Sequence, residues 1–202
     1  GGRAQWAASL AGEGEVSSKT VYNLMGGLLA WEGTTIPGFP NVQVFARDQA
    51  PDRLLKKAMD LEKGAWRFYR HAMDEYGDSP ISRVLEQIAI AEKGHASLIY
   101  RFLQEIETGL PPFEQYYQSL KGNILEGGMR FEDACARLAE FGKQSAAPII
   151  DLALSIEYAA FDLYRTMAER TADSEARTTF LAVAQAEKGH MRSLARSLTN
   201  YS

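Results

Sequence analysis

Four stretches of the chain repeat apolar residues at the three- and four-residue spacing of an amphipathic helix. We therefore predict helices over about residues 50–76, 80–107, 145–170 and 174–198. Start signals support two of them, because Ser79-Pro80 and Asp173-Ser174 are residue types that favour a first helical turn. The chain after about residue 48 is predicted to be all-α.

The segment between the second and third predicted helices has a different pattern. Residues 108–144 contain five glycines and only short helical pieces, such as Phe131 to Phe141. We interpret this segment as a long crossover between two helical hairpins.

The two predicted hairpins repeat one another. Shifting the chain by 95 residues aligns Glu62 with Glu157, Tyr69 with Tyr164, and one AEKGH motif, ending at His95, with a second, ending at His190, with no gap. Two such hairpins placed together form a four-helix bundle, here of the up-down kind with a long crossover.

The repeated acidic and histidine residues share one level of the predicted bundle. Glu92 and His95 lie three residues apart, and so do Glu187 and His190, which places each pair on one helix face. Glu62 and Glu157 each precede the second helix's glutamate by 30 residues, with the predicted turn midway. The four glutamates would then each lie about 22 Å from their turn.

These positions predict a centre that holds two metal ions. The expected ligands are Glu62, Glu92, His95, Glu157, Glu187 and His190. Four carboxylates balance two divalent ions, whereas four buried negative charges without metal would repel one another. A single E-x-x-H match is more often a solvated helix face, but two copies with matching partner glutamates favour metal. Iron is the favoured metal, and manganese or zinc suits the same ligands.

Tyr69 and Tyr164 are candidates to support the ligands. Each lies seven residues after a predicted ligand, on the same helix stripe, so its hydroxyl can reach a carboxylate of a neighbouring helix. The alternative, that both are core tyrosines with another partner, is equally open.

With these motifs, residues 48–202 resemble the rubrerythrin branch of the ferritin-like superfamily. The resemblance implies a di-iron site and redox chemistry with oxygen or peroxide. Rubrerythrins usually also carry a CxxC iron module, which the single Cys135 cannot supply, and often a further glutamate where this chain has Ala160. Electrons are therefore expected from an external donor.

Residues 1–45 resemble the C-terminal part of a rhodanese domain. The stretch VYNLMGGLLAWEGTTIPG is similar to the last strand, turn and helix of that α/β fold. The catalytic cysteine of the family would lie at or before residue 1, so no sulfur transfer is expected.

Composition narrows the expected partners and location. The 202 residues carry a net charge of −4 with mixed signs and contain no apolar run long enough to span a membrane, so neither nucleic acid nor a membrane is expected as a partner. We expect a cytoplasmic homodimer that reduces peroxide or oxygen. Iron handling of the ferroxidase type without sustained turnover, and a purely structural metal site, are the alternatives.

Overall fold

Four long helices and three short helical segments make up the described part of the chain. The computed structural model describes residues 51–141 and 146–199. The long helices are α3 (Pro51–Tyr76), α4 (Pro80–Ile106), α7 (Ala147–Arg170) and α8 (Ser174–Thr199). Their ends differ from the predicted ones by at most two residues, so these predictions are confirmed. The predicted rhodanese-like segment at residues 1–45 lies outside the described residues.

Side-chain caps explain where α4 and α8 begin. The Ser79 hydroxyl accepts a hydrogen bond from the backbone N–H of Ser82, and Pro80 has no N–H that needs a partner. Asp173 Oδ1 accepts from the backbone N–H groups of Glu175 and Ala176, at 2.9 and 2.8 Å. Both caps satisfy donors that the helix itself leaves free.

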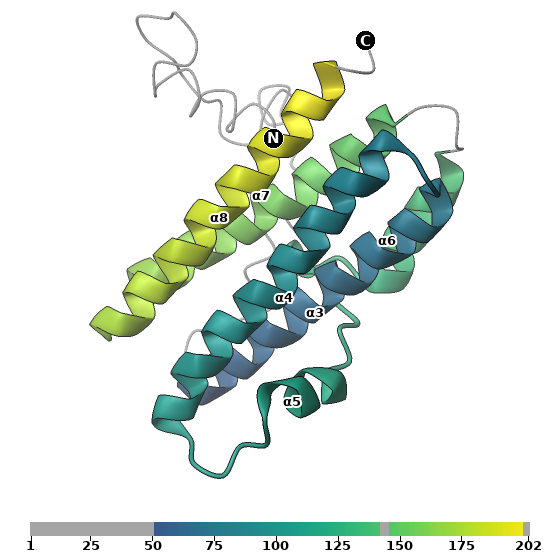
Figure 1. Cartoon of the computed structure of the whole chain (residues 1–202). Helices are drawn as coiled ribbons and strands as arrows, with labels where there is room; N and C mark the ends of the chain where they lie inside the picture. Colours follow the sequence, from purple (N-terminus) through teal and green to yellow (C-terminus); the bar gives the residue numbers. More distant parts are fainter. Residues whose placement is uncertain (1–50, 142–145, 200–202) are drawn as a thin grey trace, which may run out of the picture.

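The long helices pair as two antiparallel hairpins, α3 with α4 and α7 with α8, and α4 also packs against α8. Figure 1 shows the two hairpin turns at opposite ends of the bundle, so that α4 and α7 run in the same direction. The crossover that this arrangement requires contains α5 (Phe113–Ser119), η2 (Glu126–Gly128) and α6 (Phe131–Glu140). The described residues therefore form an all-helical bundle, which is consistent with the predicted ferritin-like fold.

The core consists of two apolar clusters with a polar layer between them. Along α4 the first cluster ends at Ala89 and the second begins at Ile99, while Glu92 and His95 lie in between. Along α8 the second cluster ends at Ala184 and the first resumes at Met191. The apolar layers on both sides keep bulk water from the acidic side chains at this level.

The glycines of the bundle differ in their surroundings. A Cβ atom at Gly94 or Gly189, inside α4 and α8, would meet nothing within 4 Å. Close approach of another segment occurs at Gly64, where a Cβ atom would overlap the backbone oxygen of Ile124 in the crossover.

Within residues 51–141 and 146–199, no helix is both long enough and apolar enough to cross a membrane.

Candidate metal centre

The fold brings all six predicted ligand residues to one place in the bundle. Each long helix contributes a glutamate, and all four glutamates are at most 2 % exposed. The two histidines lie at the edge of the group, with 10 % and 14 % of their side chains exposed. The repeat and the equal spacing across the turns thus placed these residues correctly, whereas their role as metal ligands remains a prediction.

The six residues form two overlapping groups, each able to surround one ion. One group contains Glu62 and His95, the other Glu157 and His190, and both contain Glu92 and Glu187. The potential ligand atoms of each group all lie within 4.8 Å of one another. Glu92 and Glu187 are therefore placed to serve two ions, because a carboxylate has two oxygens that can bind separate metals.

Distances around His95 match the spacing of ligand atoms about a metal ion. Its Nδ1 atom lies 3.0 Å from Glu187 Oε1, 3.2 Å from Glu92 Oε2 and 3.4 Å from Glu62 Oε2. One ring N–H cannot donate to three carboxylates. Ligand atoms about 2.1 Å from a common ion would be about 3.0 to 3.4 Å apart, depending on coordination geometry.

The environment of His190 is similar. Its Nδ1 atom lies 2.7 Å from Glu157 Oε2, 3.0 Å from Glu187 Oε2 and 3.5 Å from Glu92 Oε1. The two imidazole rings stack with centroids 5.3 Å apart. The two histidines therefore lie next to each other, each directing Nδ1 toward the carboxylates.

The two tyrosines at equivalent positions of the repeat hold carboxylates of the opposite hairpin. The hydroxyl of Tyr69 donates to Glu157 Oε1, and that of Tyr164 donates to Glu62 Oε1. Both tyrosines are fully buried, and burial raises the pKa of each hydroxyl, so each keeps its proton at neutral pH. Of the two interpretations left open, the structure favours support of the ligands.

Electrostatics show how strongly protons compete for this site. Burial raises the pKa of Glu92, and it raises that of Glu157 to about 7. Burial opposes the charge of His190, but Glu157 and Glu187 raise its pKa to about 10. The pKa of His95 is likewise raised by Glu187, Glu62 and Glu92, against the effect of burial. Without metal, these side chains therefore hold protons that a bound cation would displace.

Several carboxylate oxygens of the group accept no hydrogen bond from the described residues. These are Glu62 Oε2 and both oxygens of Glu187, which have only a histidine Nδ1 atom at ion-pair distance. Buried carboxylate oxygens without hydrogen bonds are unfavourable. The donor set, four carboxylates and two imidazoles, is of the kind that hard-to-borderline divalent ions prefer, so the residues fit a pair of such ions.

Sequence reasoning missed one acidic residue beside this group. Glu126, in the short helical turn η2, is 2 % exposed, and its pKa is raised by burial and by the charges of Glu62, Glu187 and Glu157. It belongs to neither four-residue group. No signal in the sequence identifies it, because it lies in a glycine-rich segment outside the repeat, where acidic residues are usually exposed.

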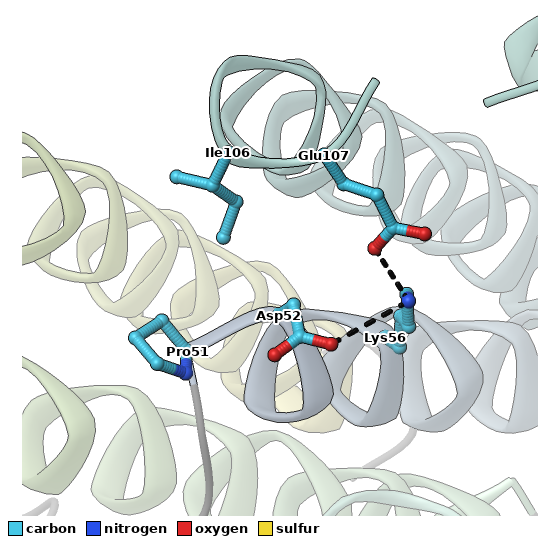
Figure 2. A pocket seen from close by; sticks show the side chains of 5 residues that line it. All are labelled: Pro51, Asp52, Lys56, Ile106 and Glu107. Atoms are coloured by element: carbon cyan, nitrogen blue, oxygen red, sulfur yellow. Dashed lines mark ion pairs between the residues drawn. The ribbon is translucent and has the colours of Figure 1, made fainter. Parts of the chain in front are cut away.

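The surface pocket in Figure 2 lies elsewhere. It is lined by Pro51, Asp52, Lys56, Ile106 and Glu107, where α3 begins and α4 ends. Asp52 precedes Glu62 by ten residues, about 15 Å along α3. Lys56 forms ion pairs with Asp52 and Glu107, so the charges of this pocket satisfy one another.

Comparison with known proteins agrees with the fold and the buried group. Residues 53–125 match the model of the Rubrerythrin family. This match includes Glu62, Glu92 and His95 and ends one residue before Glu126. Searches of curated proteins and of solved structures give no match. The helical bundle, the carboxylate–histidine group and the family match together support a relationship to the rubrerythrin and ferritin-like di-iron proteins.

Proposed function

We propose that the protein is a di-iron oxidoreductase that reduces peroxide or oxygen with electrons from an external donor. The observation that carries this proposal is the pair of overlapping ligand groups, in which two shared glutamates join two separate Glu–His pairs. An iron pair, when bound, supplies the electrons for reduction of an O–O bond. Reduction of one hydrogen peroxide to two waters consumes two electrons and two protons.

The residues of the chain would hold and orient this pair. Glu62 and His95 would bind one ion, Glu157 and His190 the other. Tyr69 and Tyr164 keep Glu157 and Glu62 in a single orientation by donating to one oxygen of each, which leaves the second oxygen free to face the metal.

The histidine edge is the natural side for a small substrate to enter. His95 and His190 are the most exposed members of the group, and the residue before each is a glycine with open space above it. The apolar layers on either side would exclude larger polar molecules. Peroxide and oxygen are small enough for this route.

The test begins with the metal-free protein. It is loaded anaerobically with ferrous iron, bound iron per chain is measured, and peroxide is added while oxidation is followed by absorbance. We expect about two irons per chain and rapid consumption of one peroxide per iron pair. The variant Glu187→Gln should lose both properties, whereas Glu132→Gln, at a 77 % exposed side chain, should retain them.

Iron handling would give a different result in the same experiment. Iron bound and oxidised well beyond the two-ion stoichiometry, with oxidised iron retained, would favour a ferroxidase-type protein. Catalytically silent metal whose removal strongly lowers Tm would favour a structural site. Failure to bind iron at all would contradict the proposal.

A further inference from the structure

The crossover places a fifth carboxylate beside the four that the long helices contribute. Glu126 lies in η2, in a tight turn in which Leu125 N donates to Met129 O at 2.8 Å and Phe131 N donates to Asn123 O at 2.9 Å. Gly127, which follows it, has φ +81°, a conformation that other residues rarely adopt. The turn is thus a defined structure and not an extended loop.

This turn is inserted between α3 and α7 at the level of the metal centre. It contacts both helices. On α3 it touches Gly64, two residues after Glu62, and on α7 a Cβ atom at Gly127 would collide with Ala159, two residues after Glu157. Two helical residues span about 3 Å, so η2 lies almost level with the two glutamates.

Anchors on α3 hold the turn in this position. Asp60 Oδ1 accepts hydrogen bonds from the backbone N–H groups of Lys121 and Gly122, both at 2.9 Å. Arg67 donates to the backbone oxygens of the same two residues, at 2.6 and 3.0 Å. The position of Glu126 therefore follows from several independent contacts.

The side chain of Glu126 is buried without a partner. Neither of its oxygens accepts a hydrogen bond from any other residue that the structure describes. The charged groups that act on it most strongly are the carboxylates of Glu62, Glu187 and Glu157, in that order. A carboxyl group buried among other carboxylates must either keep its proton or face a cation, and the expected cation is the one these glutamates would share.

We infer that Glu126 is a further carboxylate ligand of the metal centre, supplied by the crossover. This inference rests on the proposed metal centre. Five carboxylates carry a charge of −5, against +4 for two divalent ions and +6 for two trivalent ions. Glu126 would therefore stabilise the oxidised pair relative to a centre with four carboxylates.

The test compares Glu126→Gln with the wild-type protein and with Glu132→Gln, an exposed glutamate of the same crossover. Anaerobic ferrous titration against a competing chelator gives the affinity of each ion, spectroelectrochemistry gives the reduction potential, and thermal melting gives the stability of the metal-free form. For Glu126→Gln we expect one ion to bind at least about tenfold more weakly. We also expect a more positive potential and a metal-free Tm no lower than that of wild type.

The outcomes separate this inference from the proposed function. If wild type binds two ions and Glu126→Gln has the same affinities and potential, the inference fails and the proposed function stands. A metal-free Tm lowered in Glu126→Gln, with unchanged metal affinities, would show a structural role and overturn the inference. If wild type binds no metal, both fail.

Discussion

The two helical hairpins carry the same predicted ligands but hold the crossover differently. Glu62 and Tyr69 of α3 have equivalents 95 residues later in Glu157 and Tyr164 of α7. The α3 residues that anchor the crossover, Asp60 and Arg67, have no such equivalents, because the same shift leads to Ser155 and Asp162. The Ser155 hydroxyl bonds to Leu152 O within its own helix.

This difference shows that metal binding needs residues on both hairpins, whereas anchoring the crossover needs residues on one. A two-ion centre needs matching ligands from both hairpins, so the repeat extends to every residue of the six. The crossover passes through the bundle once, and its anchors are needed on one hairpin only. As a result, Glu126 lies beside a nearly symmetric centre without a symmetric partner.

The largest expected effect comes from the glutamates that both ion positions share. Glu92→Gln and Glu187→Gln should each weaken both ions by about 100-fold or more, because a bridging carboxylate contacts both. Glu62→Gln and Glu157→Gln should each weaken mainly one ion. Metal content after equilibration with a chelator measures this, and equal losses in all four variants would contradict the division into two groups.

A change of pH should alter metal affinity nearly as much as the loss of a shared glutamate. The pKa of His190 is raised from its usual value to about 10, and that of His95 is raised as well, so both rings carry a proton at neutral pH without metal. Metal must displace these protons, so affinity should rise with pH across the neutral range. We expect about a tenfold gain per ion for each pH unit between 6 and 8. Affinity measured by competition at three pH values tests this, and a flat profile would contradict it.

A smaller loss of metal affinity is expected when either tyrosine is replaced. Comparing the two replacements tests whether the two hairpins are equivalent. Tyr69→Phe and Tyr164→Phe each remove one hydrogen bond to a ligand carboxylate, and each should weaken metal binding by about 10- to 100-fold. Equal effects would support equivalent hairpins. A larger effect for Tyr164→Phe would indicate that Glu62 depends more strongly on its tyrosine than Glu157 does. No change in either variant would show that the tyrosines only fill the core.

The smallest effect concerns stability where the crossover touches the two hairpins. Gly64→Ala should lower the free energy of unfolding by about 1–3 kcal/mol, because the new methyl group overlaps the backbone oxygen of Ile124. At the equivalent position, Ala159→Gly should lower it by only about 1 kcal/mol, the usual helix propensity difference. Urea unfolding of the metal-free proteins measures both. A reversed order would mean that η2 is not packed tightly on α3.

The four long helices and the six residues that meet between them were predictable because their signals are local or repeated. Apolar spacing set the helix ends to within two residues, and the duplicated AEKGH motif identified His95 and His190. Distance from the turn then placed Glu62 level with Glu92, since an antiparallel hairpin pairs residues equally far from its turn. The partners of Tyr69 and Tyr164 were less certain, because they depend on which helix faces which.

By itself, the sequence determined the helical bundle, its duplication and the six residues that meet at one level. Only the tertiary structure decided that η2 packs between Gly64 and Ala159, that Gly94 and Gly189 border open space, and that Glu126 is buried without a partner. The physical reason is that helix periodicity repeats along the chain, whereas the path of a crossover depends on contacts between residues about 60 positions apart, such as Asp60 and Gly122.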